Sequence, residues 1–238
     1  MQLLLPENKT EQPLWWNNKI LSDDCAKYIS ALAHEVRNPL TNINLSVEML
    51  DAGIKDDELK KYLDIIARGS AQINLLVNEL LKYQMAENVQ AEQHSIHQLL
   101  NEVLSSIEDR IMLKNIEVKK NYAAEDHTIF ANKAKMKIAL TNIIINAIDA
   151  ISSNDGVLEI TTNFNNGERL IEIRDNGVGI SEEDLKRIFD PYFTNKIGGM
   201  GLGLPTTLDF LLSNHAEIDV QSKEGKGTCV ILSFDPLP

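Results

Sequence analysis

Apolar residues recur with a helical period along the first third of the chain. From residue 29 to residue 50 they return every seven positions, and a second row lies beside them. The stretch DAGIKDD, residues 51–57, interrupts this pattern, and Gly53 in it suits the end of a helix. A second run with the same period extends from Leu59 to Tyr83. The pattern therefore predicts two long helices joined by a short turn, an antiparallel helical hairpin.

The apolar stripe on this predicted hairpin is broad. Its main row consists of Ile29, Val36, Ile43 and Leu50 in the first helix and of Leu59, Ile66, Ile73 and Leu80 in the second. One pair of helices cannot bury such a stripe, so we expect residues 23–88 to form a dimeric four-helix bundle with a second copy. Residues 1–22 show no such period and are interpreted as an irregular N-terminal arm.

The period changes in the remainder of the chain, residues 89–238. Helices are predicted over residues 94–115, 131–152 and 204–215, and strands over residues 116–122, 156–164, 168–176, 216–222 and 228–234. Strands and helices do not alternate strictly, which favours an α/β sandwich with a mixed sheet over a dinucleotide-binding fold. The whole chain is thus predicted to be α+β, with a helical hairpin followed by the sandwich domain.

Composition and charge exclude several classes of function. The 238 residues carry a net charge of -12 and contain no cluster of basic residues, which argues against a nucleic-acid or anionic-membrane partner. No segment approaches the roughly 20 apolar residues of a membrane span, and the N-terminus lacks a basic signal-peptide region. Cys25 and Cys229 fit no metal spacing and are interpreted as reduced thiols of a cytoplasmic protein. His94 and His97 either hold a metal or are polar residues at a domain junction.

Two glycine-rich stretches carry the clearest chemical signal. In RDNGVGI, residues 174–180, Asp175 ends a predicted strand and can accept a hydrogen bond from an exocyclic amine. Gly177 and Gly179 let the backbone lie close to a flat ring. GGMGLGL, residues 198–204, opens a predicted helix, so its backbone N–H groups form an anion cradle. It is neither a Walker loop nor a dinucleotide fingerprint, and each motif alone also occurs in ordinary turns.

A second set of polar residues lies before and between these glycine motifs. Asn142 and Asn146 share one face of a predicted helix, where their amide oxygens can hold Mg²⁺ together with phosphate oxygens. They are also consistent with polar positions on an amphipathic helix. In IFDPYFTNK, residues 188–196, the aromatic residues can pin a loop, and Lys196 can meet a phosphate.

The sequence HEVRNPL, residues 34–40, places a histidine next to a glutamate within the first predicted helix. The zinc-protease pattern His-Glu-x-x-His fails, because residue 38 is asparagine. His34 falls outside the apolar stripe, so a second protein can reach it, although lone solvated histidines are common on helices. A neutral imidazole is a competent nucleophile, and Glu35 can hold the Nδ1 proton while Nε2 faces a phosphate. Pro39 cannot donate a helical hydrogen bond and is expected to bend the helix.

Together these motifs resemble the catalytic core of two-component sensor histidine kinases, and NAIDAI resembles the nitrogen-regulatory subgroup. HExxNPL is similar to the phosphoacceptor motif. The other segments resemble boxes of the ATP-binding domain shared with gyrase, Hsp90 and MutL. These are, in order, the N-box at residues 142–150, the G1 box at 175–180, the F-box at 189–193, the G2 box at 199–204 and the closing GxGT segment at 225–228.

The resemblance implies a specific set of functional residues. ATP is expected with its adenine on Asp175 and with Mg²⁺ on Asn146, Asn142 lying close by, under a lid of about residues 189–201. The implied nucleotide-binding residues are Asn142, Asn146, Asp175, Gly177, Gly179, Ile180, Phe189, Lys196, Gly199, Gly201, Leu202, Gly203 and Thr228. His34, with Glu35, is the implied phosphoacceptor for transfer to a response-regulator receiver domain. Asn38 is implied to position water for dephosphorylating that regulator.

Three positions depart from the commonest family pattern and leave the lid and the turnover rate open. Met200 stands where threonine is frequent, Pro205 follows the G2 box, and Asp149 occupies a position that is basic in many relatives. Two alternatives remain at this point: a nucleotide-binding pseudokinase or scaffold of the same superfamily, and a non-enzymatic dimeric adaptor. The signal, the regulator served and the choice between cis and trans phosphorylation are open. The input is either an upstream sensor domain or a partner.

Overall fold

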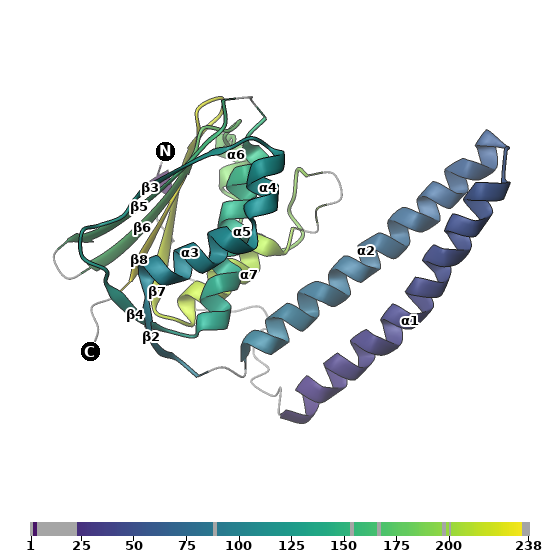
Figure 1. Cartoon of the computed structure of the whole chain (residues 1–238), viewed down its shortest axis with the longest axis horizontal. Coiled ribbons are helices and arrows are strands. Elements are labelled where there is room, and N and C mark those ends of the chain that lie inside the picture. Colours follow the sequence, from purple (N-terminus) through teal and green to yellow (C-terminus); the bar gives the residue numbers. More distant parts are fainter. Residues whose placement is uncertain are drawn as a thin grey trace. The chain divides into compact units, whose positions relative to one another are not determined.

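The computed structural model describes residues 2–3, 23–87, 90–152, 155–165, 168–196, 199 and 201–234. The chain divides into two compact units. One comprises Asn8–Asn88, and the other comprises Val89–Pro238 together with Met1–Glu7. The first unit is helical, whereas the second is built on a β-sheet (Figure 1). Within the described residues, no helix is both long and apolar enough to cross a lipid bilayer.

The helical unit is the predicted antiparallel hairpin of two long helices. Helix α1 spans Asp23–Gly53 and continues through Pro39, and helix α2 spans Asp57–Glu87. The turn is tighter than the pattern indicates, because Ile54 N still donates to Leu50 O at 2.9 Å. Asp56 then caps the start of α2, since its Oδ1 accepts from Glu58 N at 2.8 Å, a typical helix N-cap contact.

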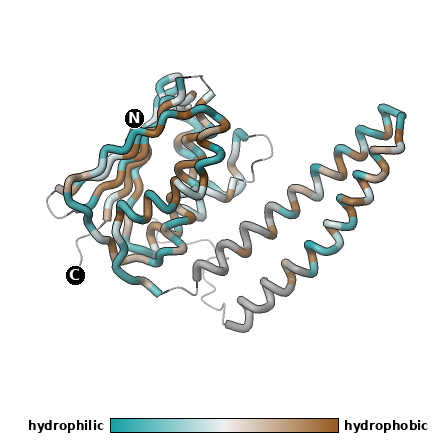
Figure 2. Tube along the Cα trace, in the orientation of Figure 1, coloured by the Kyte–Doolittle hydropathy of each residue, from teal (hydrophilic) through white to brown (hydrophobic). Residues whose placement is uncertain are grey.

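The hairpin buries little of its apolar surface by itself. Ala33, Leu40, Leu63 and Val77 are buried along the contact between α1 and α2. Hydrophobic positions nevertheless recur along both helices (Figure 2). Large apolar side chains that are exposed include Leu32, Ile43, Leu45, Met49, Leu50, Leu59, Tyr62, Ile65, Ile66 and Ile73. An exposed apolar area of this extent marks an interaction surface.

The second unit contains a mixed six-stranded sheet in the order β1-β7-β8-β6-β5-β3. Its strands are β1 (Gln2–Leu3), β3 (Glu117–Asn121), β5 (Val157–Asn165), β6 (Glu168–Asp175), β7 (Ala216–Lys223) and β8 (Gly227–Phe234). Strands β3 and β5 are parallel, and the other neighbours are antiparallel. The mixed sheet confirms the predicted sandwich class. The strands predicted over residues 156–164 and 168–176 are β5 and β6, and residues 166–167 between them lie outside the described residues.

Helices α3 (Ile96–Ser106), α5 (Lys133–Ala150) and α7 (Gly203–Leu212) cover one face of this sheet (Figure 1). The register puts alternate strand residues on that face, for example Ile160 opposite Ile173 and Ile171 opposite Leu232. These residues and the helix residues Ile144 and Ile148 are almost completely buried. Burial of this core positions the C-terminal end of α5 beside the end of β6.

Several short elements differ from the predictions. Strands β2 (Glu92–Ser95) and β4 (Thr128–Ala131) form a separate two-stranded sheet that the pattern does not indicate. The helix predicted over residues 94–115 begins only at Ile96 and breaks at Ile107, after which α4 spans Glu108–Leu113. Ser106 explains part of this break, since its Oγ donates to Val103 O at 2.7 Å and competes with the helix.

The N-terminal arm is a further correction. Gln2 and Leu3 pair with β7, so the interpretation of residues 1–22 as irregular misses a strand. Helix α6 (Glu182–Leu185) is also missed, although its N-cap is readable: Ser181 Oγ accepts from Asp184 N at 3.1 Å. The rest of the arm, residues 4–22, lies outside the described residues.

His97 lies at the junction of the small sheet and the main sheet. Its ring stacks on Tyr122 at 4.7 Å between centroids, and its Nε2 is 3.0 Å from Thr162 Oγ1. Asp126 accepts from the backbone N of His97 at 3.2 Å and is also hydrogen-bonded to Ser95 Oγ. No group of three or more potential metal ligands occurs among the described residues. The contacts of His97 are therefore those of a structural junction.

Glu102 connects α3 to α5 through ion pairs, and these make the stability of the fold depend on pH in the acid range. Lys133 Nζ donates to it at 2.8 Å and Lys137 Nζ at 3.2 Å. These two hydrogen bonds lower the pKa of Glu102 from 4.5 to about 2. Between these values the unfolded chain binds the proton more readily than the folded one, so stability falls as the pH falls through this window.

We therefore expect Glu102→Gln to reduce stability at neutral pH by less than about 1 kcal/mol, because the pair is reached by solvent. The difference from wild type should shrink as the pH falls from 4.5 towards 2. Urea unfolding of both proteins across this range measures it. A difference that stays constant with pH would contradict the assigned role of the Glu102 carboxylate.

Candidate active site

Asp175 forms the floor of the candidate nucleotide site at the end of β6. Its side chain is buried, and its Oδ1 accepts from Gly177 N at 2.8 Å and from Thr228 N at 3.3 Å. In the described part of the chain both hydrogen bonds end at Oδ1, which leaves Oδ2 for a ligand donor. Burial raises the pKa of Asp175, and the two backbone hydrogen bonds oppose this rise. The carboxylate is therefore held in one orientation in a poorly solvated place.

Gly177 and Gly179 allow the backbone to pass close to neighbouring segments. A Cβ at Gly177 would lie 2.6 Å from the carbonyl oxygen of Ala150 at the end of α5. At Gly179 φ is +70°, and a Cβ would overlap the carbonyl of Lys223. Any side chain at either position would push α5 or β7 away from Asp175. The sequence motif is thus required by close packing around the carboxylate.

Ser222, a residue that the sequence analysis does not identify, connects Ile180 and Thr228 at this side of the site. Ser222 Oγ accepts from Ile180 N at 2.8 Å, donates to Gly227 O at 3.1 Å and lies 2.9 Å from Thr228 Oγ1. A cavity of about 250 Å³ opens beside these residues, and Lys223 and Lys226 also line it. Ser222 lies opposite Thr228 because of the register between β7 and β8, and a single sequence does not indicate this pairing.

Asn142 and Asn146 lie on α5 but have different partners. Asn142 Nδ2 donates to Gly203 O at 3.2 Å and to Thr207 Oγ1 at 3.3 Å, which joins α5 to the start of α7. Asn146 Oδ1 instead accepts from Lys196 Nζ at 2.6 Å. The structure therefore places Asn146 at the Lys196 ammonium and Asn142 at the glycine loop.

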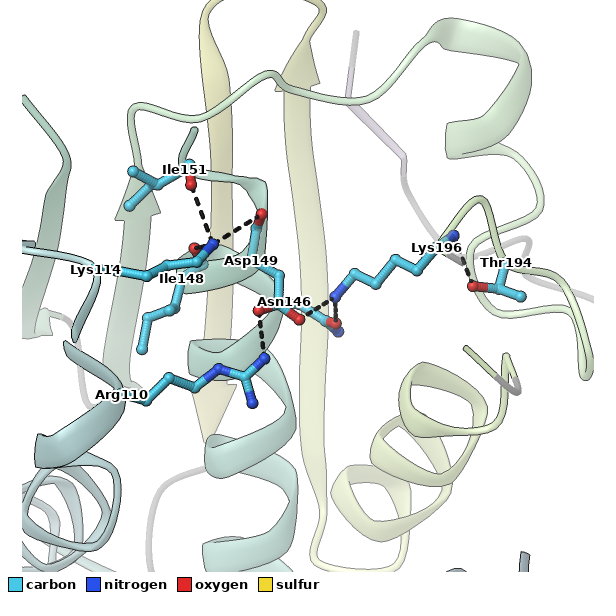
Figure 3. A network of polar contacts seen from close by, with 8 residues as sticks. All are labelled: Arg110, Lys114, Asn146, Ile148, Asp149, Ile151, Thr194 and Lys196. Atoms are coloured by element: carbon cyan, nitrogen blue, oxygen red, sulfur yellow. Dashed lines mark hydrogen bonds and ion pairs between the residues drawn. The ribbon is translucent and has the colours of Figure 1, made fainter. Parts of the chain in front are cut away.

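Lys196 belongs to a polar network at the C-terminal end of α5 (Figure 3). Its Nζ also donates to Asp149 Oδ2 at 3.0 Å, and Arg110 Nη2 donates to Asp149 Oδ1 at 2.6 Å. Lys114 Nζ donates to the carbonyls of Ile148, Asp149 and Ile151 at 2.9, 3.4 and 3.2 Å. Lysine at these carbonyls complements the helix dipole. Arg110 and Lys114 are absent from the predicted site, because their position depends on the break after α3.

The glycine loop before α7 is also set by close contacts. Gly199 N donates to Lys196 O at 3.0 Å, and a Cβ at Gly199 would lie 2.6 Å from Thr194 Oγ1. Gly201 has φ +65°, and its carbonyl accepts from Tyr192 N at 3.0 Å. Leu202 is the N-cap residue of α7, and Gly203 is its first residue. The loop thus leads directly into a helix N-terminus, as an anion site requires.

The aromatic residues of the predicted lid lie at its start. Phe189 is half-buried, whereas Tyr192 is exposed and has φ +68°. The guanidinium of Arg187 lies 4.4 Å from the centroid of the Phe193 ring, within the range of a cation–π contact. These contacts tie Phe193 to the segment after α6.

The HEVRNPL residues lie in the other unit, on α1. Glu35, Asn38 and Pro39 are exposed, and Asn38 is one helical turn beyond His34. His34 is helical, and its side chain lies outside what the structure describes. The roles of these residues remain predictions.

Comparison with known families matches both units. Residues 26–89 match the His Kinase A (phospho-acceptor) domain. Residues 131–238 match the histidine kinase-, DNA gyrase B- and HSP90-like ATPase family. The chain belongs to the histidine kinase family. Membership of the nitrogen-regulatory subgroup stays a prediction.

Curated relatives include Sporulation kinase C of Bacillus subtilis, 32% identical over 200 residues, and the histidine kinase AtoS of Escherichia coli, 32% identical over 210 residues. These matches cover 84% and 87% of this histidine kinase chain but only 46% and 34% of the relatives. The chain thus spans less than half the length of these relatives.

Among solved structures, histidine kinase ThkA in complex with the response regulator TrrA is 27% identical, with a TM-score of 0.63. That match covers 89% of this chain and 62% of the other. The catalytic domain of ThkA matches 62% of this chain and 96% of its own length at 28% identity and a TM-score of 0.56. The family match to an ATP-binding domain agrees with the predicted ATP ligand.

Proposed function

We propose that the chain is a sensor histidine kinase core that phosphorylates His34 with ATP and passes the phosphoryl group to an aspartate of a response-regulator receiver domain. The observation that carries this proposal is the buried Asp175, held at one oxygen beside Gly177 and Gly179. It is supported by the HExxN residues on α1 and by both family matches. The complex of ThkA with TrrA supports a receiver-domain partner.

The nucleotide is proposed to bind along the end of the sheet and α5. Asp175 Oδ2 accepts a hydrogen bond from the exocyclic amine of adenine, and the flat ring lies against the backbone of Gly177, Gly179 and Ile180, which close packing holds beside this carboxylate. Gly201, Leu202 and Gly203 present backbone N–H groups to the phosphates at the start of α7, and Gly199 shapes the turn before them through its hydrogen bond to Lys196 O. Phe189 and Thr228 belong to the walls of the same site.

Mg²⁺ is proposed to be held by Asn146 together with phosphate oxygens. Asn146 Oδ1 already accepts from a cation, the Lys196 ammonium, at 2.6 Å, so its oxygen is directed for a positive ligand. Mg²⁺ commonly uses few protein oxygens and several phosphate or water oxygens, which agrees with this small donor set. Bound there, the ion supplies charge neutralisation to the triphosphate. Asn142 orients the glycine loop from the same helix.

The proposed phosphoryl transfer forms one bond and breaks one. His34 Nε2 attacks the γ-phosphorus, the bond from that phosphorus to the bridging oxygen breaks, and ADP leaves with the electron pair. Glu35 holds the Nδ1 proton, which keeps the Nε2 lone pair available. Asn38 is proposed to orient a water for hydrolysis of the regulator's phosphoaspartate.

Residues 23–88 are proposed to form the homodimer, and residues 89–238 the catalytic domain. The exposed apolar residues of α1 and α2 support this, since Ile43, Leu50, Ile66 and Ile73 recur along one row of each helix. A second hairpin would cover these rows in a four-helix bundle. The proposed site of action is the cytoplasm, where receiver domains operate.

Incubation of the chain with γ-labelled ATP and Mg²⁺ tests the proposed function. Phosphohistidine is recognised as label that is lost in acid and retained in base. Label of this kind is the expected result. ATP binding without any label would instead favour the alternative, a pseudokinase or scaffold of the same superfamily.

A further inference from the structure

Asp149 joins two cations that come from different segments of the ATP-binding unit. It lies at the end of α5, and its carboxylate accepts from Arg110 on α4 and from Lys196 in the loop before α7 (Figure 3). The Asp149 side chain is 22% exposed, against 48% for Arg110 and 47% for Lys196. The acid is thus the most enclosed of these three side chains and fixes the two longer ones.

The backbone that carries Lys196 is itself held in place. Thr194 Oγ1 accepts from Lys196 N at 3.1 Å, and Gly199 N donates to Lys196 O at 3.0 Å. Asn195 Nδ2 donates to Asp184 Oδ2 on α6 at 2.7 Å. From this anchored turn the side chain reaches α5, where its ammonium meets Asn146 and Asp149 together.

The charges at this place indicate what Asp149 does. An unpaired carboxylate beside a triphosphate would repel it. Burial acts to raise the pKa of Asp149, but the hydrogen bonds and charges of Lys196 and Arg110 outweigh burial and lower it. Asp149 is therefore ionised and doubly paired at neutral pH. The chain thus places an acid at the end of α5 and brings a cation to it from the loop.

We propose that Asp149 is the positioning residue for Lys196, with Arg110 holding Asp149 from the opposite side. The inference rests on the proposed function, since it takes ATP with Mg²⁺ as the ligand. When the nucleotide binds, Lys196 releases Asn146 Oδ1 to the accompanying cation and donates to the triphosphate. Asp149 keeps the ammonium at the end of α5 throughout.

Binding of a non-hydrolysable ATP analogue with Mg²⁺ to the full chain, measured by calorimetry, tests this role. Asp149→Asn keeps the shape of the side chain and removes its charge, and Lys196→Met removes the ammonium. Each single variant is expected to bind about tenfold more weakly, which corresponds to one charge-assisted contact. The double variant should lose no more than either single variant, because both changes remove the same interaction. Asp109→Asn, an exposed acid beside Arg110, is the matched control and should bind as wild type does.

Three outcomes separate the possibilities. Binding by Asp149→Asn that equals or exceeds wild type would overturn the inference, since Asp149 would then only repel the nucleotide. A further tenfold loss when Asp149→Asn is added to Lys196→Met would also overturn it, because the effect would not pass through Lys196. A wild-type chain that fails to bind the analogue would contradict the proposed function itself, and this inference with it.

Discussion

Replacement of His34 by glutamine is expected to remove the acid-labile phosphate label, with a loss of roughly three orders of magnitude or more, as for other removed nucleophiles. Glutamine occupies a similar volume and keeps polar atoms, but its amide nitrogen has no free lone pair to attack phosphorus. The residue lies within α1, four positions before the exposed Asn38, where a polar replacement should leave the helix intact. The measurement is label per chain after incubation with γ-labelled ATP and Mg²⁺.

The companion measurements distinguish chemistry from binding. Affinity for ATP should be unchanged in His34→Gln, because His34 and the nucleotide-site residue Asp175 belong to different compact units. His94→Gln, on the small β2–β4 sheet, is the matched histidine control and should be labelled like wild type. Label of equal intensity on His34→Gln would assign the phosphoacceptor to another residue.

The glycine motifs could be located from sequence because the glycines and the carboxylate of Asp175 stand together in one short stretch. Gly177 and Gly179 immediately follow the strand end that carries Asp175, and each is required where a Cβ would overlap a neighbouring backbone. The hairpin was equally accessible, since one repeating row of apolar residues determines both the helices and their exposed surface. In both cases the signal lies within a continuous segment, although the backbones that exclude a Cβ at the two glycines, those of Ala150 and Lys223, are distant in sequence.

The remaining parts of the site depend on tertiary contacts that periodicity does not encode. Arg110 reaches Asp149 only because the helix breaks at Ile107, and Ser222 meets Thr228 only through strand register. Periodicity indicates which face of an element is buried, but it does not indicate which distant residue lies opposite. For that reason the sequence predicts Lys196 as a phosphate ligand and does not reveal that Asp149 and Asn146 share its ammonium.

Asp175→Asn should abolish useful ATP binding while leaving the fold intact. The new Oδ1 can still accept from the backbone of Gly177 and Thr228, so the local structure is retained. The ligand-facing Oδ2 becomes the Nδ2 amide, which is a donor and faces the amine of adenine, another donor. Neither of these two buried N–H groups then has an acceptor. A site built for a hydrogen bond penalises such a mismatch strongly, so we expect affinity to fall by about 100-fold or more.

The stability of the same variant should move in the opposite direction from its binding. Burial raises the pKa of Asp175, so the ionised carboxylate costs folding free energy at neutral pH, and a neutral amide removes that cost. The melting temperature of Asp175→Asn should therefore equal or exceed that of wild type while calorimetry detects no ATP binding. In wild type, affinity should also weaken as the pH falls and the carboxyl is protonated, because it then loses part of its acceptor capacity. A variant that melts much earlier would show that Asp175 serves the fold, and one that binds ATP normally would remove adenine from this carboxylate.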